Sequence, residues 1–211
     1  MSRKLLLVLS TGALAAAGLF TSGAAKASTG ASSTPSGGAC QLTGNANFTP
    51  GLTGTSGSFT YGFTGKLTSC QSSDSSVTSG SVEAGQVLTV GTSTYQEPIP
   101  TGTGSCANGT TQGTAIVTWN NGKHTVETYT TTSAGALVVL QGSVSPGITL
   151  SSTNGGSPLT INSDESAMPP GSTALGQLTF STASPTGITA CNTAAGLTSA
   201  VINGLIEAGQ A

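Results

Sequence analysis

The sequence predicts an all-β fold, in the first place an antiparallel β-sandwich with a small β-barrel as the alternative. Short alternating runs recur along the chain, with turn residues between them at the spacing typical of such folds. Thr, Ser and Gly together fill 97 of the 211 positions, and the β-branched, polar Thr suits the solvent-facing side of an antiparallel sheet. Only 6% of the residues are charged, which excludes long charged helices and coiled coils.

The N-terminus predicts export. Arg3 and Lys4 precede an apolar stretch, and Ala25-Lys26-Ala27 fits a signal-peptidase site. We therefore expect a signal peptide at residues 1–27, a flexible leader at 28–38 and a single β domain at 39–211. The mature protein is expected to be secreted and extracellular, in association with the cell wall or free of it.

The first half of the domain is expected to contain several short strands and a loop. The clearest strand is Ser58–Leu67, in which Phe59, Tyr61 and Phe63 share one face. A Pro50-Gly51 turn should follow the first strand. The other strands expected here are Gln41–Phe48, Val77–Val82 and Gln86–Val90, and Thr101–Gly113 is expected to be a loop.

A hairpin is the strongest local signal in the chain. Alternating runs in Thr114–Thr132 flank Asn121-Gly122, the preferred pair for a type I′ turn. Strands are also expected at Gly135–Val144 and Leu175–Ser181, with a loop-rich Ser151–Thr173 between them that holds a short strand near Leu159–Ile161. The C-terminal segment fits either a helix or a tight hairpin at Asn203-Gly204, and the Thr-rich context favours strands.

Four cysteines in an exported chain predict two disulfides. Cys40–Cys70 with Cys106–Cys191 is the favoured pairing, because Cys40 and Cys70 bracket what looks like one hairpin. Cys70–Cys106 with Cys40–Cys191 remains a close alternative. No C-x-x-C spacing occurs and the single histidine is isolated, so neither a metal site nor a cofactor is expected.

Charge excludes several kinds of partner. The chain has five Lys and Arg, of which only Lys66 and Lys123 follow the expected signal peptide. That number is too small for a nucleic-acid interface, and no membrane association is expected after signal cleavage. The expected partner is a cell-wall glycan or an extracellular protein, and the sequence leaves the oligomeric state open.

Candidate binding residues are aromatic. Trp119, Tyr61 and Tyr129, with Tyr95, would form a sugar-binding platform if they gathered on one sheet face. The alternative for Trp119 is a core position, since it shares a face with Val117.

Candidate catalytic residues are few, and we assign none. His124 is the only histidine and has no G-x-S-x-G partner motif. Glu83, Glu97 and Glu127 lie on or beside expected strands, where two carboxylates would be able to support glycoside hydrolysis. Asn162, Asp164 and Glu165 supply oxygen atoms to one loop but lack a calcium-binding pattern.

Several segments together resemble small secreted proteins of high-GC Gram-positive bacteria. These segments are ACQLTG (39–44), FTYGFTGKLTSC (59–70), TGTGSCANGTTQG (101–113), VTWNNGKHTVETYTTT (117–132), VVLQGSV (138–144) and ACNTAAGL (190–197). The resemblance spans most of the expected mature chain. It implies an exported, disulfide-bonded β-protein and carries no catalytic residue over to this sequence.

The sequence therefore favours a secreted, non-enzymatic binding or structural module. The alternatives are a secreted glycoside or ester hydrolase and a protease-inhibitor-like protein that presents the Ser151–Thr173 loop.

Overall fold

The computed structural model describes residues 37–181 and 187–210. The expected signal peptide (1–27) and residues 28–36 of the expected leader lie outside this part of the chain. The first strand begins at Gly37, two residues before the expected start of the domain.

The described residues form thirteen strands and one short helix, α1 (Gly187–Ala190). The strands are β1 (Gly37–Leu52), β2 (Gly57–Ser72), β3 (Gly80–Ala84), β4 (Val87–Val90), β5 (Ser93–Gln96), β6 (Thr101–Gly104), β7 (Asn108–Trp119), β8 (His124–Ala134), β9 (Leu137–Ser145), β10 (Gly147–Leu150), β11 (Leu159–Asn162), β12 (Thr173–Ser181) and β13 (Leu197–Gly209).

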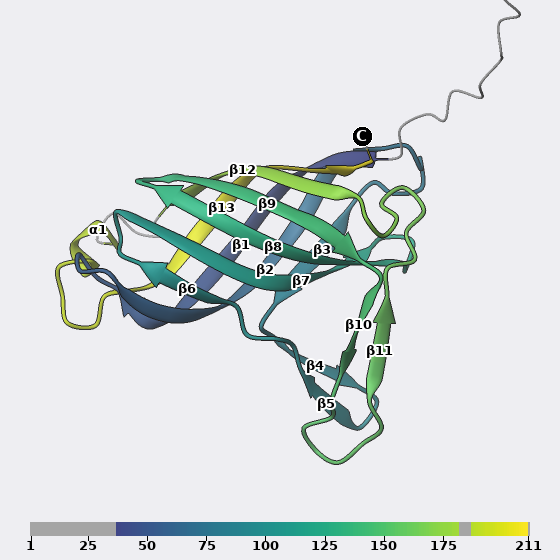
Figure 1. The fold of residues 1–211 in the computed structure, drawn as a ribbon, viewed down its shortest axis with the longest axis horizontal. Coiled ribbons are helices and arrows are strands. Elements are labelled where there is room, and N and C mark those ends of the chain that lie inside the picture. The colour runs from purple at the N-terminus through teal and green to yellow at the C-terminus, as the bar shows by residue number, and fades with distance from the viewer. Residues whose placement is uncertain (1–36, 182–186, 211) are drawn as a thin grey trace, which may run out of the picture. The chain divides into compact units, whose positions relative to one another are not determined.

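The main sheet closes on itself. The order of its strands is β1-β13-β12-β9-β8-β7-β3-β2, and all of these pairings are antiparallel. Because β1 also pairs with β2, the ring of strands is complete. The described residues therefore form an eight-stranded antiparallel barrel (Figure 1). The sequence predicts a sandwich, with a barrel as the alternative. The chain adopts the barrel, because β1 pairs with both β2 and β13 and so closes what would otherwise be an open sheet.

One position in the ring is shared by two short strands. β3 and β6 both pair with β2 on one side and β7 on the other. Between them the chain leaves the wall at Gly85, forms the β4-β5 hairpin and returns through Pro98 and Pro100. The two prolines, which cannot donate a hydrogen bond to a neighbouring strand, thus mark the return into the wall.

A second excursion joins the first outside the barrel. The β10-β11 hairpin and the β4-β5 hairpin project together from the wall (Figure 1), and Tyr95 bridges to Ser152. We call these four strands the arm. A separate apolar cluster fixes it to the barrel, formed by Tyr95, Leu150 and the outward-facing Ile116 of β7.

Inside the barrel, aromatic rings lie over glycines. A Cβ atom built onto Gly44 of β1 would overlap the Phe63 ring of β2, and one built onto Gly102 would overlap the Phe59 ring. Glycine in a strand often marks such a close approach. The many glycines therefore make room for the large rings that fill a narrow barrel.

The two disulfides are Cys40–Cys70 and Cys106–Cys191, which confirms the favoured pairing. The first joins neighbouring strands β1 and β2. The second joins the β6-β7 turn to the segment before β13. Two disulfides indicate an oxidising compartment, in line with the expected export. Within the described ranges, no helix has the length and hydropathy that a bilayer crossing requires.

Several local expectations need correction. Thr101–Gly113 is not a loop but contains β6 and the start of β7. The segment around Asn203-Gly204 is neither a helix nor a hairpin but the middle of β13, where it pairs with both β1 and β12.

The hairpin at Asn121-Gly122 is confirmed, but its turn is not type I′. Gly122 has a φ of 80° and Asn121 does not share the positive φ that a type I′ turn requires. A hydrogen bond from the Trp119 N–H to the Lys123 carbonyl closes a three-residue turn instead.

Gly44→Ala is expected to destabilise the barrel by about 1–3 kcal/mol, because the added methyl group overpacks the Phe63 ring. Gly57→Ala is the matched control, since a Cβ atom added at Gly57 would have no neighbour within 4 Å. Urea denaturation measures both changes. Equal losses in the two variants would contradict the ring-over-glycine packing.

Candidate functional site

The barrel interior is closed at one end by loops. We call this the closed end; β1 begins there at Gly37, β7 ends there at Trp119 and β8 begins there at His124. The end lies at the right in Figure 1, the side on which the C-terminus is marked. The β2-β3 loop, the β7-β8 turn and the segment at 163–172 meet there. Val77, Ala167 and Met168 from these loops are buried in the main core, so apolar side chains plug the end.

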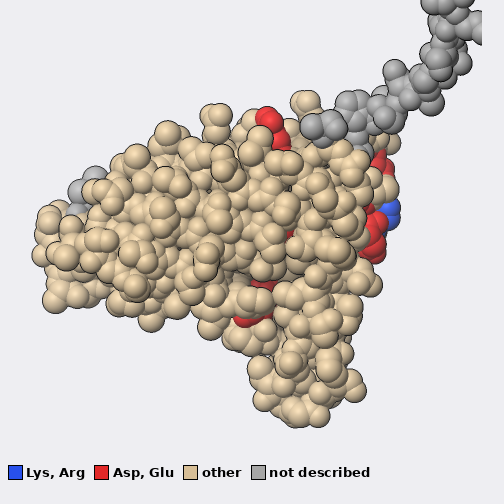
Figure 2. Space-filling model, in the orientation of Figure 1, with Lys and Arg blue, Asp and Glu red and all other residues tan. Residues whose placement is uncertain are grey.

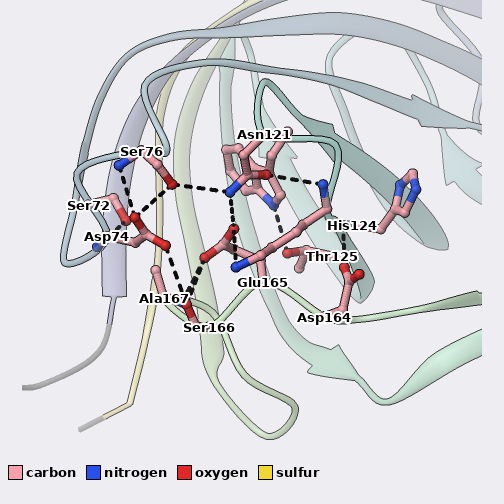
Figure 3. A network of polar contacts seen from close by, with 12 residues as sticks. Ser72, Asp74, Ser76, Asn121, His124, Thr125, Asp164, Glu165, Ser166 and Ala167 are labelled. Carbon is pink, nitrogen blue, oxygen red and sulfur yellow. Dashed lines mark hydrogen bonds and ion pairs between the residues drawn. The ribbon is translucent and has the colours of Figure 1, made fainter.

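A polar network holds the plug in place (Figure 3). The Glu165 side chain is fully buried; its Oε2 accepts a hydrogen bond from Asn121 Nδ2 at 2.7 Å and its Oε1 accepts one from the Ala167 N–H at 3.0 Å. Lys123 Nζ lies 3.9 Å from Glu165 Oε2. One buried carboxylate thus ties the β7-β8 turn to the loop that fills the end of the barrel.

A second carboxylate joins the third loop to the network. Asp74 accepts hydrogen bonds from the Ser76 N–H and hydroxyl, which are the main reason that the Asp74 pKa is lowered. Asn120 Oδ1 accepts bonds from the N–H groups of Thr78 and Ser79. Acidic side chains and a lysine gather at this end, and most of the other surface in view carries no charge (Figure 2).

An apolar cavity of about 130 Å³ lies within the barrel beyond the plug. Most of its wall is aliphatic or aromatic, with Leu42, Phe48, Phe59, Leu140 and Leu178 among the lining residues. Eight-stranded barrels are just wide enough to be filled by side chains or to hold one small ligand. This barrel is filled in part and leaves room for a group about the size of one ring.

One stripe of the cavity wall is polar, and it follows β8. Glu127, Tyr129, Thr131 and Ser133 alternate with outward-facing residues and line the cavity. Glu127 and Tyr129 are buried, whereas Thr131 and Ser133 are half-buried. The polar stripe therefore becomes more exposed toward the end of the barrel opposite the plug.

Hydroxyl groups connect this stripe to the facing strands. Tyr61 and Tyr129 are hydrogen bonded through their hydroxyls at 2.7 Å, and Tyr61 is bonded to Thr111 Oγ1 at 3.1 Å. Thr111 is in turn bonded to Thr131 at 2.7 Å. Burial raises the pKa of both tyrosines, so they remain neutral hydroxyls that can donate and accept.

Glu127 is the deepest polar group of the stripe. Only 8% of the residue is exposed, and its Oε1 is buried without a hydrogen-bond partner among the described residues. Burial raises the pKa of the carboxyl to about 7. A buried carboxyl with an unsatisfied oxygen is costly, and such groups occur preferentially at functional sites.

Glu97 and Glu83 lie elsewhere. Glu97 is fully buried beside the exit of the arm, where its Oε2 accepts a hydrogen bond from the Gln86 N–H at 2.9 Å. Burial, with a smaller contribution from the Glu83 charge, raises the Glu97 pKa to about 7. Glu83 alternates with the inward-facing Val82 and Ala84 of β3, so it is on the outer face while Glu127 lines the interior.

The aromatic candidates are divided between three places. Tyr61 and Tyr129 lie together in the cavity wall. Trp119 is buried in the core near the plug, where its Nε1 donates to Thr125 Oγ1 at 2.9 Å, and Tyr95 is in the arm cluster. The structure therefore brings two of the four together, inside the barrel rather than on an exposed platform.

His124 and the acidic loop have structural contacts. The His124 ring lies 3.2 Å from the Thr118 hydroxyl, and Asp164 accepts a hydrogen bond from the His124 backbone N–H. Glu165 is engaged in the plug, where it accepts a hydrogen bond from Asn121. Within residues 37–181 and 187–210, no group of three His, Cys, Asp or Glu residues is placed to hold a metal.

The cavity itself was not identified from the sequence. Nothing in the sequence distinguishes Thr111, Thr131 and Ser133 from the many other threonines and serines of the chain. The sequence signal for the polar stripe is the alternation of Glu127, Tyr129, Thr131 and Ser133 on one strand. This alternation indicates a cavity lining only when the sheet is known to close into a barrel.

Glu165→Ala is expected to lower the free energy of unfolding by about 3 kcal/mol, because it leaves the Asn121 amide and the Ala167 N–H without their buried acceptor. Glu207→Ala, which removes an exposed carboxylate, should change it by less than about 0.5 kcal/mol. Chemical denaturation compares the two, and similar effects would refute the structural role of Glu165.

Stability is expected to fall as pH rises from about 4.5 to 7. The Glu127 pKa is raised in the folded state, so the neutral carboxyl favours folding at low pH and this contribution is lost as the group ionises, up to about 3 kcal/mol. Glu97 acts in the same direction. Denaturation midpoints at pH 5 and pH 8 should differ less in Glu127→Gln than in the wild type; an unchanged difference would contradict the assignment.

No protein-family model matches this chain, and no curated protein or solved structure is detectably similar to it.

Proposed function

We propose that this protein is an extracellular, non-enzymatic binding module that holds a small, largely apolar molecule inside its barrel. The observation that carries the proposal is the cavity of about 130 Å³ with an apolar wall and one polar stripe. Ligand sites are typically apolar with a few convergent polar groups that orient the ligand. An apolar protein cavity of about 150 Å³ is known to accept benzene.

The rigidity of the barrel supports binding in the interior. The ring of strands has no open edge, the plug fixes one end, and a disulfide joins the loops at the other. A preformed cavity loses little conformational freedom when a ligand enters, which favours affinity. The polar groups of the stripe come from β2, β7 and β8, so the sheet itself holds them in position.

The other functions suggested by the sequence find less support. A protease inhibitor would present the loop at 151–173. Residues 153–158 of that segment are exposed, but Glu165, Ala167 and Met168 are buried in the plug, so the segment is not one continuous exposed loop. A hydrolase that uses a pair of carboxylates would need both on one face. Glu83 is on the outer face of the wall and Glu127 lines the interior, while Glu97 does not line the cavity and its Oε2 accepts a hydrogen bond from the Gln86 N–H. Binding of a cell-wall glycan to the outer surface remains a prediction without a recognisable platform among the described residues.

Val138→Phe tests the cavity as the binding site. Val138 lines the cavity, while the adjacent Val139 is exposed on the outer face of β9. Ethylbenzene should shift the NMR signals of interior methyl groups in the wild type and in Val139→Phe. It should bind Val138→Phe at least about tenfold more weakly, because a ring then occupies the site.

Circular dichroism establishes that both variants are folded. If Val138→Phe does not fold, Val138→Ile adds one methylene to the same wall and should weaken binding to a lesser degree. An absence of ethylbenzene binding in the wild type, or equal binding to all variants, would overturn the proposal.

A further inference from the structure

We propose that the cavity selects ligands that carry an ammonium group, which the Glu127 carboxylate receives. The inference rests on the proposed function, because it assigns the chemical class of the molecule bound in the same cavity. It is carried by the geometry of one side chain: Glu127 is more than nine-tenths buried, lines the cavity and has an oxygen without a partner among the described residues.

The described part of the protein supplies no cation for this carboxylate. Its only basic residues that are always charged are Lys66 and Lys123. Lys66 is exposed on β2, and Lys123 lies beside Glu165 in the plug. Buried carboxylates are normally paired or kept neutral, and a cation for the ionised form of Glu127 would have to be supplied by a ligand.

The surroundings of Glu127 favour a compact group with several donors. Its register neighbours are Ala115 on β7 and Val144 on β9, neither of which has a polar side chain. Two residues along β8, Tyr129 is close enough for the Glu127 charge to raise the tyrosine pKa. An ammonium group has three donors, and the carboxylate offers it two acceptor oxygens, of which Oε1 has no partner among the described residues.

The apolar part of the cavity wall determines the chemistry and size of the rest of the ligand. Beyond the polar stripe the wall is aliphatic and aromatic, and its volume suits about one ring. The expected ligand is therefore a small primary amine with an apolar body. An alcohol of the same shape offers one donor and no charge, so it should be bound less well.

Three probes of equal size separate these possibilities: ethylbenzene, benzyl alcohol and benzylamine. At pH 8 the wild type should bind benzylamine at least about tenfold more tightly than either neutral probe, as measured by NMR titration. Glu127→Gln should abolish this preference for benzylamine over ethylbenzene. Glu83→Gln, which changes a carboxylate on the outer face, should retain the preference.

The pH dependence provides a second readout. Burial places the Glu127 pKa at about 7, whereas benzylamine stays protonated in this range, so the preference should decline between pH 8 and pH 5. The other titratable groups that act on this region are Tyr61 and Tyr129, which remain neutral, and Glu97, whose charge acts on Tyr129. Glu97→Gln should therefore leave most of the decline in place.

The outcomes are distinguishable. If no probe binds, the proposed function fails. If ethylbenzene binds and benzylamine binds no better, the cavity is a binding site but the inference about amines is wrong. Equal binding of benzyl alcohol and benzylamine would show that a neutral donor suffices, and a preference that survives in Glu127→Gln would exclude Glu127 as the acceptor; either result overturns the inference.

Discussion

Closure of the sheet through β1 is the constraint on which the rest of the structure depends. This strand pairs with β2 along one side and with β13 along the other, so it brings the two halves of the described chain together. Because the ring is complete, every strand acquires an inside and an outside. The alternation of large and small residues along each strand then decides what fills the interior. The cavity, the plug and the polar stripe all follow from that division.

A barrel of this width has to accommodate large aromatic side chains in its interior, and the high glycine content makes this possible. Gly44, Gly102 and Gly113 lie against Phe63, Phe59 and Tyr129, so these glycines allow close packing of the rings. Thr covers much of the outer surface, where it suits a sheet that faces water. The barrel can therefore be stable with few large aliphatic residues, supported by its two disulfides.

Sequence patterns were sufficient for the all-β class, the hairpin around Asn121-Gly122 and the favoured cysteine pairing, since each depends on local alternation or spacing. They could not decide between sandwich and barrel, because closure depends on pairing between β1 and β13, which are far apart in the chain. The same limit applies to the site. Tyr61 and Tyr129 were candidates, but their hydrogen bond and their position beside Glu127 arise from long-range register. The role of Glu165 in the plug depends on loops that no local motif connects.

The burial of Glu127 also determines how strongly its charge responds to the salt concentration of the medium. Salt screens exposed charges strongly and buried ones much less. The exposed Lys66 should therefore lose most of its influence as ionic strength rises, whereas a carboxyl enclosed by the barrel wall should keep its field. The proposed selectivity for amines should therefore depend little on salinity, which would suit the extracellular medium that the sequence predicts.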